Sequence, residues 1–242
     1  MSKRILIVLH QETSTPGRVG LKLQQKGYEL DIRRPALGCE LPVDARAYAG
    51  AIIFGGPMSA NDDIEHDYIR KEIDWIATPL AQGVPYLGIC LGGQMLARQL
   101  GGRVYGHPDE RAEIGYYKIS PTSHGEAFGP WPERVYQWHR EGFDLVDGAV
   151  NLAEGGEHFP NQAFAYNDTA FAIQFHPEVT QKMMHRWLVK AEHRLSLPGA
   201  QPRDSHFRDR FIYDRAVDAW LDRFLDQWLA TAKHETVRLA AE

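Results

Sequence analysis

Short runs of apolar residues alternate with amphipathic stretches through the first hundred residues of the chain. The apolar runs are bounded by glycine or proline, as buried strands commonly are. The stretches between them repeat apolar side chains at a spacing of three and four residues, which places those side chains on one face of a helix. We expect strands over residues 5–9, 28–33, 51–54 and 85–89, and helices over residues 17–26, 67–81 and 91–100, with Pro79 as a point where the second helix could stop.

This order of elements has a consequence for the fold. Strands that alternate with helices form a parallel sheet, because each helix crosses back over the sheet before the next strand begins. We therefore predict an α/β fold with an open, mostly parallel, twisted sheet and helices on both of its faces.

The pattern changes between residues 104 and 174. Short β-like runs are separated there by turn-rich segments such as SPTSHGE, so this part is predicted to be mixed or antiparallel. A helix over residues 181–195 and a linker, SLPGAQPRDS, are expected to follow. The β-like runs cover residues 116–119, 134–137, 163–166 and 170–175.

The last segment carries one broad apolar stripe. Its members are Ile212, Ala216, Trp220, Phe224 and Trp228, which recur every four residues, with Val217, Leu221 and Leu225 beside them. Such a stripe predicts an amphipathic helix. We expect a domain over residues 1–195 and, over residues 196–242, a linker and a helical extension that packs back on it. Two alternatives stay open for the stripe: a contact between copies in a homo-oligomer, and a lid over the site.

Composition and charge exclude several classes of protein. The chain has 242 residues, of which 43% are hydrophobic and 24% are charged, as in a soluble globular protein with a large core. A net charge of −5, without a cluster of lysine and arginine, gives no basic surface for nucleic acid or for a membrane. The first apolar run is too short for a signal peptide or a membrane span. Cys39 and Cys90 form no disulfide framework, so we expect a cytoplasmic protein.

Cys90 lies in the segment YLGICLGGQ, between a predicted strand and a predicted helix. A residue at such a turn is exposed at the carboxyl edge of the sheet, where open α/β folds bind their ligands. The helix N-terminus favours a thiolate, and Gly88 and Gly92 leave room for a sharp turn. The sequence alone fits either a nucleophile or a small apolar residue in a tight turn.

Two more segments place chemistry at the same edge. His176 follows the run FAIQF, and Glu178 comes two residues later, where its carboxylate can orient the imidazole. The segment FGGPMS follows the strand predicted at residues 51–54, and its glycines let backbone N–H groups approach a developing oxyanion. Together the three segments predict a nucleophile, a base and an orienting acid.

These segments closely resemble the motifs of the class I, triad-type glutamine amidotransferases, in the family's chain order. The family includes the glutaminase domains of GMP synthetase, anthranilate synthase and carbamoyl-phosphate synthetase. The resemblance covers residues from about 3 to 190 and is strongest to stand-alone domains similar to the GMP synthetase amidotransferase, with VYQWHREGF matching that group's Trp–His stretch. It implies a flavodoxin-like fold.

The resemblance also implies roles for individual residues. Cys90 would be the nucleophile, His176 the general base and acid, and Glu178 its partner. The N–H groups of Gly56 and Leu91 would form the oxyanion hole. Gln94 would contact the glutamine substrate, with Ser59 and His139 nearby. The family often has Gly-Asp after the histidine, whereas Arg140 and Glu141 follow here, so substrate contacts in this loop are expected to differ.

The implied reaction is hydrolysis of the γ-carboxamide of L-glutamine through a γ-glutamyl thioester, without cofactor or metal. Ammonia would go to an acceptor site, which we expect on a separate synthetase subunit, because the chain has no G-x-x-x-x-G-K-[ST] phosphate loop. Two alternatives remain at this stage. One is a stand-alone γ-glutamyl hydrolase or peptidase with the same triad, and the other is a catalytically silent regulatory or binding subunit.

Overall fold

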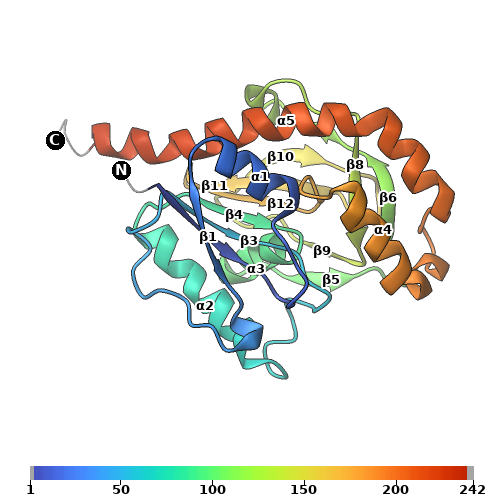
Figure 1. Ribbon diagram of the computed structural model, residues 1–242, viewed down its shortest axis with the longest axis horizontal. Helices are drawn as coiled ribbons and strands as arrows, with labels where there is room; N and C mark the ends of the chain where they lie inside the picture. The colour runs from blue at the N-terminus through green and yellow to red at the C-terminus, as the bar shows by residue number, and fades with distance from the viewer. Residues whose placement is uncertain (1–2, 239–242) are drawn as a thin grey trace.

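An eight-stranded sheet forms the centre of the computed structural model, which describes residues 3–238 and gives side chains up to residue 232 (Figure 1). Its strands lie in the order β2-β1-β3-β4-β12-β11-β10-β7, and the first five are parallel. This confirms the predicted parallel sheet. The five parallel strands are β2 (Glu29–Arg33), β1 (Arg4–Val8), β3 (Gly50–Ile53), β4 (Tyr86–Ile89) and β12 (Ala170–Ile173).

The remaining strands are antiparallel, which agrees with the mixed or antiparallel structure predicted between residues 104 and 174. Three of them extend the main sheet beyond β12, and four form two separate two-stranded sheets, β5-β9 and β6-β8. Their bounds are β11 (Asn161–Tyr166), β10 (Val150–Glu154), β7 (Ser120–Pro121), β5 (Val104–Gly106), β9 (Glu141–Phe143), β6 (Glu113–Lys118) and β8 (Arg134–His139).

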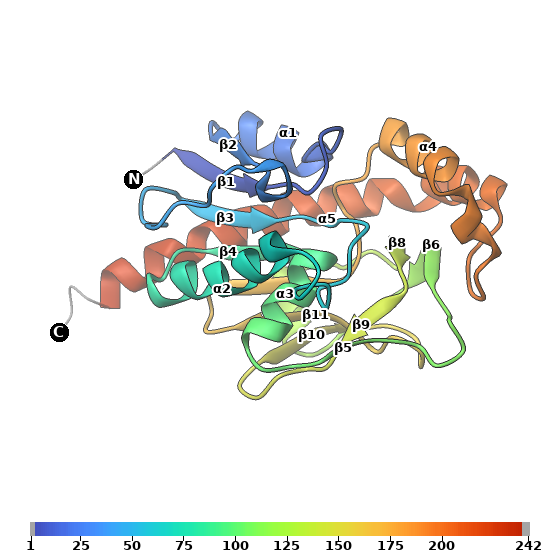
Figure 2. The same cartoon turned by 90° about the horizontal axis from the view of Figure 1, so that it is seen from below.

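Helices cover both faces of the main sheet because successive strand side chains point to opposite faces. Ile5 and Ile7 pack into one apolar cluster with α1 and α5, whereas Leu6 and Val8 pack into another with α2 and α3. Figure 2 shows α2 and α3 in front of the strands and α5 behind them. The helices are α1 (Gly17–Gln25), α2 (Asp67–Ala81), α3 (Leu91–Gln99), α4 (Gln181–Lys190) and α5 (Arg203–Arg238), with short 3₁₀ helices η1 (Pro35–Leu37), η2 (Gly125–Phe128) and η3 (Glu192–Ser196). None of the described helices is both long enough and apolar enough to cross a membrane.

The C-terminal helix α5 packs back on the sheet, and Trp220, Phe224 and Trp228 are fully buried. Ile212 and Ala216, which we placed on the same stripe, are exposed. The reason is geometric: a series of every fourth residue drifts by about 40° per step around a helix with 3.6 residues per turn. The first two members have therefore rotated away from the sheet. Residues 239–242 of the predicted extension lie outside the described residues.

The predicted end of one helix at residue 81 is confirmed, and the predicted end of another differs from the structure. Helix α2 continues past Pro79 to Ala81, and the Pro79 carbonyl accepts a hydrogen bond from the amide of Val84. Pro79 has no N–H to donate to the carbonyl of Trp75, so the helix lacks one hydrogen bond there but still continues to Ala81. The helix predicted over residues 181–195 ends at Lys190, and the chain tightens into η3. This early end turns Arg194 toward the site described next.

Candidate active site

Cys90 occupies a strained turn between β4 and α3. Its φ of 52° and ψ of −105° lie outside the regions that residues with a side chain commonly adopt. Glycine is required both before and after Cys90, because the backbone passes very close to Gly88 and Gly92. A Cβ at Gly88 would lie 2.3 Å from the carbonyl oxygen of Gly92, and a Cβ at Gly92 would lie 2.0 Å from the carbonyl oxygen of Ile53. This is the geometry of a nucleophile elbow.

The pairing of two parallel strands brings residue 90 close to residue 176. Strand β12 pairs with β4 so that Ile173 lies opposite Ile89, and the amide of Cys90 donates to the Ile173 carbonyl at 2.8 Å. The chain then needs three more residues to reach His176, whose amide donates to Tyr136 at 2.8 Å. Both side chains therefore emerge at the same carboxyl edge of the sheet.

His176 and Glu178 form a buried pair, with 2.7 Å between His176 Nδ1 and Glu178 Oε1. Burial disfavours the charged imidazole, but the charges of Glu178 and of the Cys90 sulfur outweigh burial and raise the pKa of His176 to about 10. Since Nδ1 is bound to Glu178, the nitrogen left for Cys90 is Nε2, which is buried and has no hydrogen-bond partner among the described residues. The Trp187 ring meets the imidazole edge-on, with 4.9 Å between centroids.

The glycine pair after β3 lies directly against these side chains. A Cβ at Gly55 would lie 2.8 Å from His176 Cε1 and 3.5 Å from Cys90 Cβ. A Cβ at Gly56 would lie 3.0 Å from Leu91 Cδ2, so the two residues predicted to form the oxyanion hole are neighbours. Their role stays a prediction.

A small pocket of about 20 Å³ opens on Cys90 and Gln94. Gln94 is buried, and its Nε2 donates to the carbonyl of Glu141 at 2.9 Å and to Gln174 Oε1 at 3.3 Å. Gln174 in turn donates to Cys90 Sγ at 3.6 Å. Sequence reasoning missed Gln174. A polar residue inside the apolar run FAIQF is the signal that could have found it, because a buried amide needs partners.

His139 and Ser59 hold the wall of this pocket. His139 is buried between Glu113, 3.0 Å from its Nε2, and the carbonyl of Glu141, 3.0 Å from its Nδ1. The Ser59 hydroxyl donates to Glu141 Oε1 at 2.8 Å, and Ser59 itself lines neither this pocket nor the next. The unusual Arg140-Glu141 pair thus gives Ser59 and His139 a shared partner.

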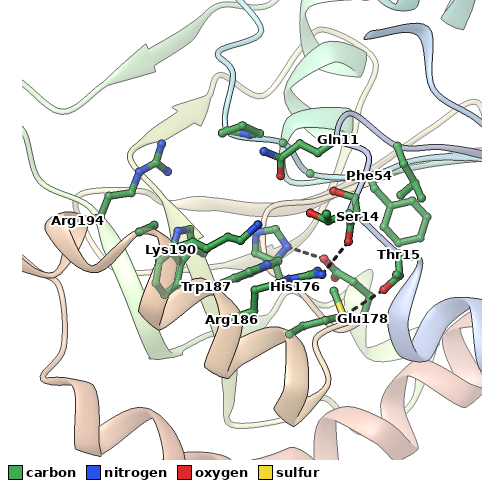
Figure 3. Close-up of a pocket in the computed structure, with 18 of the residues that line it drawn as sticks. Gln11, Ser14, Thr15, Phe54, His176, Glu178, Arg186, Trp187, Lys190 and Arg194 are labelled. Atoms are coloured by element: carbon green, nitrogen blue, oxygen red, sulfur yellow. Dashed lines mark hydrogen bonds and ion pairs between the residues drawn. The ribbon is translucent and has the colours of Figure 1, made fainter. Parts of the chain in front are cut away.

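A second, larger pocket of about 280 Å³ adjoins the small one. His176 and Glu178 line it, and it shares Gly56, Pro57, Trp138 and Arg194 with the small pocket. Figure 3 shows side chains of α4 on one side and Gln11 and Ser14, from the segment after β1, on the other. The sequence did not reveal this pocket, because it forms where segments distant along the chain meet.

No group of histidine, cysteine, aspartate and glutamate suited to holding a metal ion occurs among residues 3–238.

Comparison with known proteins decides the family. A family model described as glutamine amidotransferase class-I matches residues 20–193. The chain belongs to the class I glutamine amidotransferases. Within the family it is similar to the glutamine amidotransferase-like protein YfeJ of Salmonella typhimurium, with 28% identity over 80% of this chain and 83% of the relative. It is also 31% identical to a glutamine-hydrolyzing GMP synthase of Azoarcus over 54% of this chain, but that match spans only 26% of the synthase.

Solved structures of the same family share the fold. A glutamine amidotransferase from Methylobacillus flagellatus matches with a TM-score of 0.88 at 28% identity and covers 96% of both chains. One from Thermotoga maritima matches with a TM-score of 0.83 at 29% identity, over 93% of this chain and 97% of that one. Both matches extend well beyond residues 20–193, so the C-terminal helix has a counterpart in the fold of these relatives.

Proposed function

We propose that this class I amidotransferase hydrolyses the γ-carboxamide of L-glutamine through a Cys90–His176–Glu178 triad. One observation carries the proposal: a cysteine in a strained turn at a helix N-terminus lies beside an imidazole that a buried carboxylate orients. With a pKa of about 10, His176 is protonated at neutral pH and supplies the positive charge that a thiolate needs as a partner.

The chemistry follows from these charges. The Cys90 thiolate attacks the γ-carbonyl carbon, and the N–H groups of Gly56 and Leu91 bind the resulting oxyanion. As the C–N bond breaks, His176 Nε2 gives its proton to the leaving nitrogen, which departs as ammonia and leaves a γ-glutamyl thioester. Neutral His176 then takes a proton from water, the hydroxide attacks the thioester, and glutamate is released as the C–S bond breaks. The thiolate and the imidazolium are thereby restored.

Residues around the small pocket would contact the glutamyl part of the substrate, which is larger than that pocket and also needs room in the adjoining large pocket. Both donor contacts of Gln94 go to protein atoms, so only its Oε1 is free to accept from the substrate's α-ammonium group. Arg140 and Arg194 line the same pocket and would bind the α-carboxylate. Burial and the nearby Arg140 charge lower the pKa of Arg194, as expected for two cations that lie close together. His139 and Ser59 would act through Glu141, which they fix in place.

The ammonia formed would pass to a synthetase site on a separate protein, as we expected from the sequence. Among the relatives, the glutamine-hydrolyzing GMP synthases are about four times longer than the part that matches this chain. The ammonia acceptor of this chain is therefore not inferred from those relatives. A pull-down with this chain as bait would identify it.

A second candidate function is hydrolysis of γ-glutamyl amides with a larger amine than ammonia. The observation that favours it is the pocket of about 280 Å³ lined by His176, the proposed proton donor to the leaving nitrogen. The triad, the thioester and the residues of the small pocket would be the same for both substrates.

Glutamate release from L-glutamine tests the proposal, with Cys39→Ala as a control matched to Cys90→Ala. Cys39 is exposed and lies outside both pockets, so Cys39→Ala is expected to keep full activity. Cys90→Ala is expected to lose about 10³-fold or more. Equal activity in the two variants would refute the triad. A wild-type protein that hydrolyses neither glutamine nor any γ-glutamyl amide would support the silent subunit instead.

A further inference from the structure

We propose that His10 and Glu72 form a buried positioning pair, which holds the Gly55–Gly56 peptide so that the Gly56 N–H faces the developing oxyanion. Neither side chain lines either of the two pockets, so the pair acts through this peptide and does not touch the substrate. The inference rests on the proposed function, in which the Gly56 N–H binds the oxyanion.

The pairing of two strands places His10 beside Gly55. Strand β1 pairs with β3 so that Val8 lies opposite Ile53, and the amide of Phe54 donates to the Val8 carbonyl at 3.1 Å (Figure 2). His10 and Gly55 each come two residues after this pair of opposite residues, at the carboxyl edge of the sheet. His10 Nδ1 lies 3.2 Å from the Gly55 carbonyl oxygen.

Both ring nitrogens of His10 face acceptors. The Gly55 carbonyl can only accept, so Nδ1 must carry a proton to bind it. Nε2 lies 2.7 Å from Glu72 Oε2, and neither side chain has any exposed surface. Burial disfavours the charged imidazole, but the charge of Glu72 and the hydrogen bonds to Glu72 and Gly55 outweigh burial and raise the pKa of His10. Glu72 therefore keeps the ring protonated at the nitrogen that binds Gly55.

Packing alone does not explain this pair. Glu72 lies on the buried face of α2, with Ile69, Ile73 and Ile76. Taking two ionisable groups out of water is unfavourable, and apolar residues of similar size often stabilise a fold as well or better. Glu72 Oε1 is also buried without a hydrogen-bond partner among the described residues. The contact with Gly55 gives the pair a role that apolar residues could not supply.

The orientation of the Gly55–Gly56 peptide matters because its two polar groups point in opposite directions. None of the described peptide bonds is cis, so a Gly55 carbonyl directed at His10 turns the Gly56 N–H away from His10. Within residues 3–238 that N–H has no hydrogen-bond partner, which leaves it available to an oxyanion. Cys90 is close by, since a Cβ at Gly55 would lie 3.5 Å from Cys90 Cβ.

Glycine on both sides of this peptide makes an external contact necessary. A peptide between two residues without Cβ atoms rotates with little steric resistance. The same glycines that let the backbone approach Cys90 therefore leave the direction of the N–H poorly fixed. His10 supplies the missing restraint, because its ring also packs against Gly56, where a Cβ would lie 3.1 Å from His10 Cγ.

Two variants of His10 separate the two contacts of the ring. Asparagine carries its NH₂ group as far along the side chain as Nδ1, so it can still donate to Gly55 but does not reach Glu72. Glutamine carries its NH₂ group as far along as Nε2, so it can still bind Glu72 but leaves the Gly55 carbonyl without its donor. The measurements are kcat and KM for glutamate release from L-glutamine, the urea midpoint of unfolding, and the rate at which iodoacetamide alkylates Cys90. Alkylation requires the thiolate but forms no oxyanion.

We expect His10→Gln to lower kcat about 10- to 100-fold, somewhat less than the loss of an oxyanion-hole donor, and to leave KM and the alkylation rate within about twofold. His10→Asn is expected to keep kcat within about fivefold of the wild type. Its urea midpoint is expected to fall further than that of His10→Gln, because it leaves the Glu72 carboxylate buried and unpaired. The more stable variant is thus the less active one, an order that a merely structural role would not produce.

A second pair of variants serves if His10→Asn does not fold. His10→Asn/Glu72→Met contains no buried carboxylate, and His10→Leu/Glu72→Met has nearly the same shape without the donor to Gly55. The first is expected to have a kcat about 10-fold or more above that of the second.

The outcomes are distinguishable. Equal kcat in the two variants of a pair, or a larger loss in the asparagine variant, overturns the inference, while glutamate release by the wild type leaves the proposed function standing. An alkylation rate that falls as far as kcat in His10→Gln also overturns the inference, because the variant then disturbs the Cys90 thiolate. A wild-type protein that releases no glutamate from L-glutamine or from any γ-glutamyl amide overturns the proposed function and the inference with it.

Discussion

Replacing Glu178 by glutamine removes one charge from the proposed triad and keeps its shape. In the structure, Glu178 Oε1 lies 2.7 Å from His176 Nδ1, and Oε2 is buried without a hydrogen-bond partner among the described residues. The glutamine amide must therefore either bury its NH₂ group unsatisfied or turn it toward Nδ1. The second arrangement places a donor against the nitrogen that donates in the wild type, and it favours the wrong tautomer of the imidazole.

The size of the effect follows from the causes of the raised pKa. The negative charges of Glu178 and Cys90 together overcome burial and hold the pKa of His176 at about 10. Loss of one opposite charge at this distance typically lowers a pKa by about one to three units. We expect the basic limb of the profile of kcat/KM against pH to move down by that amount. The turnover number is expected to fall on the order of 10²- to 10⁴-fold.

The assay is glutamate release from L-glutamine between pH 6 and pH 11, with Glu157→Gln as the matched control. Glu157 is exposed and lies 3.4 Å from His158, so this variant makes the same chemical change in a Glu–His pair outside both pockets. We expect its pH profile to match the wild type. A Glu178→Gln profile whose basic limb stays in place would refute the assignment of His176 as the proton donor.

Four further predictions concern the surroundings of the triad and its stability. Gly55→Ala places a Cβ 2.8 Å from His176 Cε1 and is expected to lower kcat about 10²-fold or more with little change of the unfolding midpoint in urea. Gln174→Leu removes the donor to Cys90 Sγ and is expected to slow alkylation of Cys90 by iodoacetamide about tenfold. Trp228→Ala empties a fully buried site and is expected to cost about 3–5 kcal/mol of unfolding free energy, against less than about 0.5 kcal/mol for Phe211→Ala, which is 93% exposed. Folding raises the pKa of His176 from 6.5 to about 10, so the stability that the protonated imidazole contributes is complete below pH 6.5 and is lost as pH rises through 10. Urea unfolding at pH 6 and at pH 10.5 is expected to show this loss of stability in the wild type and a smaller loss in Glu178→Gln.

The fold and the proximity of the three residues of the proposed triad could be predicted from the sequence for one physical reason. Cys90 and His176 each follow an apolar run that forms a parallel strand, and the carboxyl ends of parallel strands lie at one edge of a sheet. The positions of both residues follow from the order of the strands and do not depend on how individual side chains pack. Glu178 is only two residues from His176, so local geometry suffices for it as well.

The rest of the site depends on packing that local patterns do not encode. Arg194 lines the large pocket from η3, which follows the end of α4 at Lys190, whereas periodicity predicted one helix to residue 195. Gln94 is buried because Gln174 and the carbonyl of Glu141 accept from it, and from the sequence alone it fits an ordinary helix surface equally well. These contacts join segments that are 47 and 80 residues apart in the chain.

Trapping the covalent intermediate tests the central claim most directly. The enzyme is mixed with L-glutamine, quenched in acid within the first turnover, digested and examined by mass spectrometry. We predict a γ-glutamyl group on the peptide that contains Cys90, and none on that peptide in His176→Gln, in which the proton donor to the leaving nitrogen is missing. A γ-glutamyl group on a different residue, or glutamate release at the wild-type rate by Cys90→Ala, would contradict the account.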